Sequence, residues 1–264
     1  MRRAGGCVLL MVLSLSAGAQ TEDLSNPWDG PYCADPALRE LMDWVSFQVS
    51  FDAGSMVPEM AAGEYDLSVH GTPQFATGLR GQALIAGEGS GRAIYPRGPN
   101  ATMGTRGAVS LWICPVAWTH DKGGNTTFLM TTNSSFYLQR QGPMHNEEGR
   151  CTRHEGFQYL IRGEITGNKT LMVGTEKWPL GKWRFIVANW SWPTMSLSID
   201  GGEFKSASVK NSPDEDYFGK LVVGATGGEK TLIDELAIYR RPLTLDEVRL
   251  LFETFNPAAS EEGQ

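Results

Sequence analysis

The stretch TLIDELAIYRRPLTLDEV, residues 231–248, decides the fold because it joins a strand to a helix near the C-terminal end of the chain. Leu232, Leu236 and Ile238 recur at even spacing, which places them on one face of an expected strand. Pro242 follows this apolar run and removes a backbone donor, so the strand is expected to end before it. The segment therefore predicts a last strand with one face turned toward a core.

The second half of the same stretch carries the signals of a helix start. Thr244 is followed three residues later by Glu247, which is the spacing of a capping box. Leu243 and Val248 flank that box at the positions of a hydrophobic staple. The chain is therefore expected to pass from its last strand into a short C-terminal helix.

Short apolar runs separated by Gly, Pro and Asn fill most of the preceding chain. Strand-like alternation occurs over 109–114 (VSLWIC), 185–188 (FIVA) and 195–200 (MSLSID), and the last run stops at Gly201 and Gly202. Each run reads as a strand with one face turned inward. Many short strands at this spacing predict an all-β sandwich or barrel rather than an α/β sheet.

One further helix is expected near the start of the folded body. Asp35 is a good N-cap, Pro36 suits the first helical position, and apolar residues then recur at helical spacing up to about Trp44. Alternating residues over 45–51 predict that a strand follows directly.

The N-terminus has the composition of a secretory signal peptide. Arg2 and Arg3 precede an apolar core over 7–15, and small residues lead to Gln20. We expect residues 1–19 to be removed and the product to be secreted, into the extracellular space or into the periplasm of a Gram-negative source. The apolar core is shorter than the roughly 20 residues that span a bilayer, and no later stretch reaches that length, so no membrane-spanning segment is expected.

Charge and cysteine content narrow the possible partners. The chain holds 30 acidic and 23 basic residues, a formal charge of −7, which argues against nucleic acid as a partner. Cys33, Cys114 and Cys151 follow the signal segment, and export would permit one disulfide. Cys114 with Cys151 is the preferred pair because both lie in the expected folded body.

Three further stretches support a family resemblance when read with the closing segment. Residues 78–84 read GLRGQAL, residues 107–113 read GAVSLWI, and the span 183–200 begins with a tryptophan-led strand and ends in a second strand before a Gly-Gly turn. In this order they resemble the laminin G-like, concanavalin A-like lectin/glucanase jelly-roll domains. The resemblance extends over residues 46–253.

The resemblance implies an all-β fold, a two-sheet antiparallel jelly-roll sandwich with a short helix at each end. Residues 20–45 would form the N-terminal lead and helix, 46–253 the laminin G-like domain, and 254–264 a polar tail. The implied function is a binding or adhesion module for a glycan or an extracellular partner. Its oligomeric state is left open.

A structural Ca²⁺ between the first and last strands is also implied by the resemblance. Asp52 closes the first core strand, and Asp234 lies on the same side of its strand as Leu236 and Ile238. A core-facing acid is costly unless it is paired or liganded. Asp234 is therefore expected either to ligate calcium with Asp52 or to cap a nearby loop through backbone N–H groups.

Glycan binding would need exposed aromatic faces. Trp118, Trp190 and Trp192 lie in or beside expected loops and strand ends, where an indole can stack on a sugar ring. The alternative is that these side chains cover strand edges as part of the packing.

Catalysis is the second hypothesis. Glycosidases with this fold place carboxylates at i, i+2 on one strand face. This chain offers Glu64 and Asp66 in a Gly-rich stretch, and Asp214 with Asp216 in an expected turn after Pro213. A polysaccharide lyase needs a cation and a Tyr or His base, and His154, Tyr159 and Arg162 supply those types. Tyr159 and Arg162 would point to opposite faces of a strand, so an enzyme is disfavoured.

Two alternatives concern regions outside these motifs. The charged insertion between residues 136 and 157 is expected to be either a solvated loop or the wall of a binding groove. A non-catalytic structural subunit of an extracellular assembly is the third functional hypothesis, and it would carry an exposed apolar patch.

Overall fold

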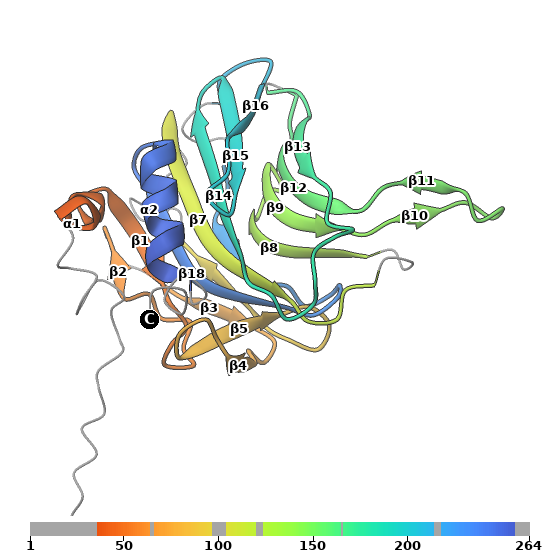
Figure 1. Cartoon of the computed structure of the whole chain (residues 1–264), viewed down its shortest axis with the longest axis horizontal. Coiled ribbons are helices and arrows are strands. Elements are labelled where there is room, and N and C mark those ends of the chain that lie inside the picture. The colour runs from red at the N-terminus through yellow and green to blue at the C-terminus, as the bar shows by residue number, and fades with distance from the viewer. Residues whose placement is uncertain are drawn as a thin grey trace, which may run out of the picture.

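The computed structural model describes residues 36–63, 66–96, 104–119, 124–164, 166–213 and 218–256. The expected signal peptide, Cys33 and Glu64 lie outside these ranges. Two antiparallel sheets pack face to face, and a helix covers the outer side of one of them (Figure 1). The all-β sandwich expected from the sequence is confirmed.

The larger sheet has nine strands and includes both ends of the folded body. Its hydrogen-bonded order is β16 (Lys205–Ser208), β15 (Thr194–Ile199), β14 (Arg184–Ser191), β7 (Arg106–Pro115), β18 (Thr231–Tyr239), β1 (Val45–Val49) and β2 (Met60–Ala61), with β5 (Gln82–Ala86) beside β18 and β4 (Phe75–Thr77) beside β5. The strand predicted from the closing segment thus lies between β7 and β1, at the centre of this sheet.

The smaller sheet has seven strands. Its order is β13 (Lys169–Val173), β12 (Gly156–Ile161), β9 (Phe136–Gln141), β8 (Asn125–Thr131), β17 (Leu221–Val223), β6 (Arg92–Tyr95) and β3 (Ser68–His70). In β9, Phe136 and Leu138 are buried against the other sheet, whereas Tyr137, Gln139 and Gln141 are half-buried on the opposite side. Because of this alternation, the outer face of the smaller sheet is partly exposed to solvent.

Apolar side chains fill two clusters, one on each side of the nine-stranded sheet. The first lies between the sheets and includes Phe47, Leu111, Phe136, Tyr159 and Trp190. The second lies under the helices and includes Trp112, Phe185, Leu251 and Phe255. Because both faces of β7 and β18 are covered, these strands are buried along almost their whole length.

Both predicted helices are present. Helix α1 (Pro36–Met42) precedes β1, and its expected cap Asp35 lies outside the described residues. Helix α2 (Leu245–Phe255) begins with the predicted capping box, in which Thr244 Oγ1 accepts from the Glu247 N–H and Glu247 Oε2 accepts from the Thr244 N–H. No helix among the described residues is long and apolar enough to cross a membrane.

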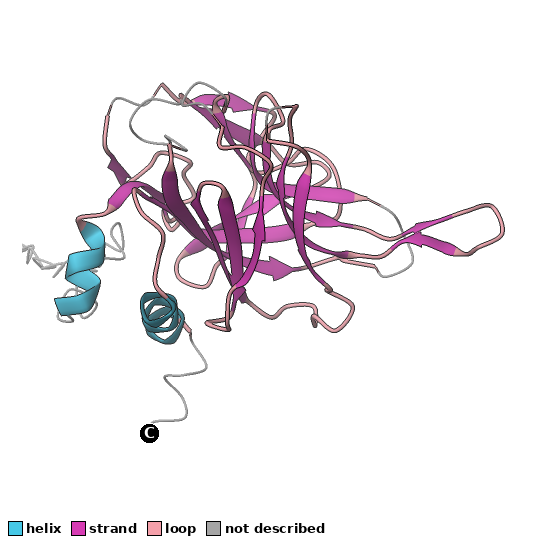
Figure 2. Cartoon of the chain, turned by 90° about the horizontal axis from the view of Figure 1, so that it is seen from above, coloured by secondary structure: helices cyan, strands magenta, loops and turns pink. Residues whose placement is uncertain are grey.

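A third, two-stranded sheet projects from the sandwich as an arm (Figures 1 and 2). It consists of β10 (Met144–His145) and β11 (Cys151–Arg153), and every side chain from Met144 to Thr152 is exposed. Of the two alternatives for the charged insertion, the structure favours the solvated one, in the form of an extended hairpin.

The expected disulfide between Cys114 and Cys151 is wrong, because both thiols are free. Cys114 is buried in β7, and Cys151 is exposed on the arm that projects away from the sandwich. Sequence position placed both residues in the folded body but could not show that the insertion carries one of them outward.

The two thiols should therefore react at very different rates. Burial raises the pKa of Cys114 to about 11, so little thiolate forms at neutral pH. The Cys151 thiol, in contrast, is exposed to solvent. We expect a thiol reagent to label Cys151 in the native protein and Cys114 only after denaturation, as read by peptide mass mapping. The Cys151→Ser variant is the control, and rapid native labelling of Cys114 would contradict the structure.

Candidate functional site

A β-bulge in the last strand sets the position of two acids. The register between β18 and β7 shifts between Asp234 and Ala237, and Glu235 has a positive φ of 48°. Such a bulge redirects side chains that would otherwise alternate strictly across the sheet. As a result Asp234 and Glu235, which would point to opposite faces of a regular strand, contribute carboxylates to one buried cluster.

The corner after β1 brings a third acid to the same place. Phe51 has a positive φ of 68°, and its carbonyl accepts a hydrogen bond from the Gly54 N–H at 2.8 Å, which closes a turn. Asp52 lies in this turn and is 8% exposed. Neither of its carboxylate oxygens has a hydrogen-bond partner within the described part of the chain. Two buried acceptors without donors require an explanation.

The turn over residues 78–81 forms the third side of the acidic cluster, beside the bulge in β18 and the corner after β1. The Gly78 N–H donates to the Gly81 carbonyl at 3.1 Å, and the Leu79 N–H donates to Asp234 Oδ2 at 2.7 Å. A Cβ on Gly78 would lie 2.5 Å from both the Arg80 carbonyl oxygen and Asp234 Oδ2. This closeness explains the glycine in the GLRG motif. It also shows that Asp234 does cap a loop, the alternative considered from the sequence.

The three carboxylates repel one another in a poorly solvated space. One ligand oxygen from each of Asp52, Asp234 and Glu235 lies within 4.8 Å of the others. Burial raises the pKa of Asp52 to about 6, against an opposing effect of the Arg80 charge. Burial also raises the pKa of Asp234 to about 8, and that of Glu235 well above its usual value. The folded protein thus disfavours the ionised forms of all three groups.

A calcium ion suits this donor set. Calcium takes six to eight oxygens from carboxylates and backbone carbonyls, and it compensates the burial of acids that have too few partners. Asp52 and Asp234, expected from the sequence, lie together as a metal site requires. Glu235 was missed as a member of this cluster because a regular strand would have turned it away from Asp234, and nothing in the sequence marks the bulge.

The expected sugar-stacking role of three tryptophans is not supported. Trp190 is fully buried and donates from Nε1 to the Gly104 carbonyl at 3.1 Å. Trp118 is 4% exposed and donates to Thr231 Oγ1 at 2.7 Å. Trp192 is half-buried and stacks on both Trp190 and Phe218. Trp118 and Trp190 thus belong to the core between the sheets, and Trp192 packs against it, which agrees with the alternative that these side chains serve packing.

The residue types considered for a lyase do not converge. Tyr159 points into the core, where its hydroxyl donates to the Asn189 carbonyl at 3.3 Å and burial raises its pKa well above the usual value. Arg162 is exposed on the other side of the same sheet, with its guanidinium 5.4 Å from the Tyr137 ring. The predicted separation of Tyr159 and Arg162 onto opposite faces is correct.

A row of amides lies on the outer face of the seven-stranded sheet. Gln139 Nε2 donates to Gln158 Oε1 at 2.8 Å, and Gln158 Nε2 donates to Gln141 Oε1 at 2.6 Å. Gln141 Nε2 in turn donates to the His154 carbonyl at 2.9 Å, at the base of the β10–β11 arm. We call Gln139, Gln141 and Gln158 the glutamine ladder. These three residues were not predicted as a site from the sequence, although the alternation of Gln139 and Gln141 in β9 indicates a shared face.

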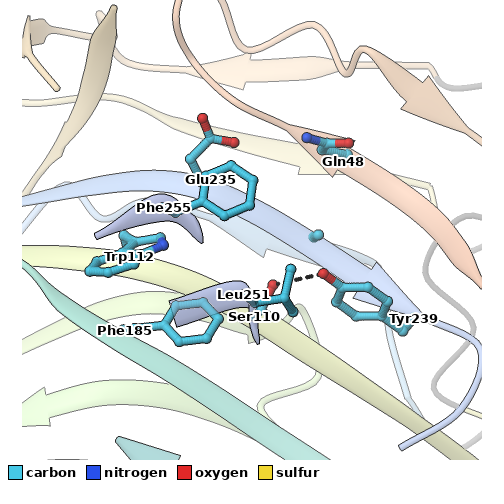
Figure 3. A pocket seen from close by; sticks show the side chains of 9 residues that line it. Gln48, Ser110, Trp112, Phe185, Glu235, Tyr239, Leu251 and Phe255 are labelled. Atoms are coloured by element: carbon cyan, nitrogen blue, oxygen red, sulfur yellow. Dashed lines mark hydrogen bonds between the residues drawn. The ribbon is translucent and has the colours of Figure 1, made fainter. Parts of the chain in front are cut away.

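A small pocket lies between the nine-stranded sheet and α2 (Figure 3). Its walls combine aromatic and polar groups, namely Gln48, Ser110, Trp112, Phe185, Glu235, Ala237, Tyr239, Leu251 and Phe255. Ser110 Oγ lies 3.3 Å from the Tyr239 hydroxyl. Glu235 therefore belongs both to the acidic cluster and to the wall beneath α2.

Comparison with protein families assigns the chain to a class. A laminin G family model, described as the concanavalin A-like lectin/glucanases superfamily, matches residues 87–249. This match covers more than half of the chain, so the protein belongs to that superfamily. No curated protein matches the sequence.

Similar solved structures agree with this fold. The botulinum neurotoxin serotype D binding domain has a TM-score of 0.64 at 15% identity, covering 81% of this chain and 52% of that one. The binding domain of botulinum neurotoxin DC in complex with rat synaptotagmin II gives 0.65 at 14%, covering 82% and 53%. The serotype D ligand binding domain with N-acetylneuraminic acid gives 0.62 at 16%, covering 82% and 52%. This chain spans about half the length of each.

Proposed function

We propose that this protein is a secreted, non-catalytic binding module, held together by calcium, whose ligand lies on the outer face of the seven-stranded sheet. The observation that carries the proposal is the glutamine ladder. It presents amide donors and acceptors on a sheet face over which no helix or second sheet of the described chain packs. Amides bind hydroxyl and carbonyl groups through both kinds of hydrogen bond.

The residue types in the glutamine ladder also favour binding over catalysis. Sandwich glycosidases need two carboxylates at i, i+2 on one strand face, one as acid and one as nucleophile or base. Gln139 and Gln141 have that spacing in β9, and each carries an amide that can neither transfer a proton nor attack a sugar. The residues therefore support recognition without bond cleavage.

Binding is also what the similar structures record for their own proteins. One was solved with synaptotagmin II and one with N-acetylneuraminic acid, so related sandwiches occur in proteins that bind a receptor protein or a sugar. For this chain the partner would be a glycan or an extracellular protein, consistent with the signal peptide expected at residues 1–19.

Calcium would supply stability in this proposal. Asp52, Asp234, Glu235 and the backbone of the 78–81 turn would hold the ion and so join three segments that are distant in sequence. The site lies in the nine-stranded sheet, on the far side of the core from the glutamine ladder. Calcium is therefore assigned a structural role, with no part in ligand contact.

The proposal is tested by a glycan array with parallel turnover assays on polysaccharides. We expect the wild type to bind a glycan without turnover. Gln139→Leu should lose this binding, because a ligand hydroxyl that is buried in the complex would have no side-chain amide to hydrogen-bond with. Gln74→Leu, a change at an exposed glutamine before β4, is the matched control and should bind normally. Turnover by the wild type, or binding that is indifferent to Gln139→Leu, would exclude the proposal.

A further inference from the structure

The β10–β11 arm gathers sulfur and nitrogen metal ligands on a short stretch of chain. Two of the four histidines of the protein, His145 and His154, lie in or beside its strands, together with Cys151. All three side chains are exposed. The acidic cluster around Asp52 offers only oxygen, which suits calcium, whereas thiolate and imidazole suit zinc. The donor atoms of the arm therefore differ in kind from those of the acidic cluster.

Cys151 and His154 lie at nearly the separation of two ligands of one metal ion. The Cys151 Sγ atom is 3.9 Å from His154 Nδ1. In a tetrahedral zinc site, with Zn–S at about 2.3 Å and Zn–N at about 2.0 Å, the sulfur and the nitrogen lie about 3.5 Å apart. A small rotation of either exposed side chain closes this difference. The pair is thus close to the geometry that zinc requires.

The register of the arm brings a third ligand to the same face. His145 of β10 is the direct cross-strand partner of Cys151. Side chains directly opposite each other in an antiparallel pair point to one face, with Cβ atoms about 4.5–5.5 Å apart.

A bulge in β11 explains why His154 also reaches this face. The register runs from the pair of His145 and Cys151 to the pair of Met144 and Arg153, so Thr152 is an extra residue in β11. In a regular strand, residues three apart point to opposite faces, and one extra residue cancels that alternation. The sequence alone does not mark this bulge, so the three ligands could not be grouped from their spacing.

The charged residues of the arm do not oppose a cation. Glu147 and Glu148 lie in the exposed turn at the tip, and the exposed Arg150 follows them. The guanidinium of Arg153 is held at the base of the arm, where Nε and Nη2 donate to the Gly142 carbonyl at 3.1 and 3.0 Å. Two acids thus balance two arginines over the arm.

We propose that Cys151, His154 and His145 form a zinc site on the β10–β11 arm, with the fourth tetrahedral position open to water or an external ligand. The Cys151 thiol donates to the Arg153 carbonyl at 3.2 Å, and its proton is released to solvent when the thiolate binds the metal. The inference depends neither on the ligand proposed for the outer sheet face nor on calcium.

Zinc at this position would fix the arm relative to the sandwich. An isolated two-stranded hairpin is only marginally stable in water. The metal would join β10 and β11 to His154, whose carbonyl accepts from Gln141 of the glutamine ladder at 2.9 Å. Amide exchange over residues 144–153 should therefore slow when zinc is added, as hydrogen-exchange mass spectrometry measures.

The test follows the reactivity of Cys151 in the full chain carrying Cys33→Ser, which removes a second thiol that could bind metal or react. One equivalent of Zn²⁺ should slow maleimide labelling of Cys151 at least about tenfold, because the metal occupies the nucleophilic thiolate, and a chelator should restore the rate. Ca²⁺ at the same concentration should give no protection, since calcium binds oxygen ligands.

Two histidine variants show whether the thiol acts alone. His154→Ala and His145→Ala should each weaken zinc affinity, measured by competition with a chromophoric chelator, by at least the roughly 10–100-fold that loss of an outer hydrogen-bond partner costs. His70→Ala is the matched control, because His70 is also exposed but lies on the edge strand β3, and it should keep the affinity.

Three results would overturn the zinc site. The first is labelling of Cys151 that zinc does not slow. The second is protection that persists undiminished in both histidine variants, since the thiol alone would then bind the metal. The third is a titration endpoint of one zinc per two chains, because the metal would then bridge copies instead of occupying one arm.

Discussion

Calcium at about a hundredfold excess over its dissociation constant should raise the melting temperature of the wild-type protein by roughly 5–10 °C. Ligand linkage at that excess contributes about 2.7 kcal/mol, and each kcal/mol shifts Tm by about 2–4 °C for a domain of this size. The same addition should leave the melting temperature of Asp234→Asn nearly unchanged, because the amide removes one of the three carboxylates that would hold the ion. Differential scanning calorimetry in calcium and in chelator measures both.

Asp200→Asn is the matched control for this experiment. Asp200 is a half-buried aspartate that accepts from a backbone N–H, that of Phe185 at 2.8 Å, and pairs with Arg184, but it lies in the turn after β15 and outside the acidic cluster. Its variant should keep the full calcium response. A wild-type melt that is identical in calcium and in chelator would end the proposal of a structural calcium.

The pH dependence of the metal-free protein follows from the same cluster. Asp234 has a pKa of about 8 in the fold against an ordinary value of 3.8, so the folded state binds a proton more tightly than the unfolded chain. This group therefore favours folding at acidic pH, and its contribution is lost as pH rises from about 4 to about 8. In chelator, stability should be lower at pH 8 than at pH 5.5, and calcium should reverse that order. This is checked by urea unfolding at both values.

Asp52 could be predicted for this site because it ends the first core strand. Asp234 was predicted as a buried acid on the face of Leu236 and Ile238. It is buried, but the bulge between Asp234 and Ala237 places it on the other face, where it pairs with Trp112 under α2, whereas Leu236 packs between the two sheets. Glu235 could not be predicted, since its position depends on a bulge with a positive φ. Local backbone departures of this kind arise from tertiary contacts, which a single sequence does not display.

The same limit explains the errors at the ends of the sandwich. Trp118 and Trp190 were placed near strand ends correctly, but both side chains pack into the core between the sheets, Trp118 against Trp178 and Trp190 against Phe136, so both are buried. Cys151 was placed in the folded body, yet the β10–β11 arm carries it into solvent. Periodicity predicts which face of a strand is buried, whereas the direction of a loop depends on its contacts with distant segments.

Replacement of Arg140 by methionine should destabilise the protein by about 3–5 kcal/mol, because it removes the cation that Glu155, which is buried, and Glu229, which is half-buried, share. Arg140 is fully buried in β9, with its guanidinium 3.2 Å from Glu155 Oε2 and in direct contact with Glu229. It also donates to the Thr119 carbonyl at 2.7 Å and lies 5.0 Å from the Trp118 ring. Methionine has a similar length but offers no donor, and urea unfolding measures the loss.

The combined variant Arg140→Met, Glu155→Gln, Glu229→Gln distinguishes a lost ion pair from a packing defect. If the cost comes from uncompensated carboxylates, neutral amides should restore most of the stability, because the charges that need a partner are gone. If packing around Trp118 is responsible, the triple variant should remain as unstable as Arg140→Met. Glu155 directly follows the β10–β11 arm, so the ion-pair explanation further requires faster amide exchange at the base of the arm in Arg140→Met alone.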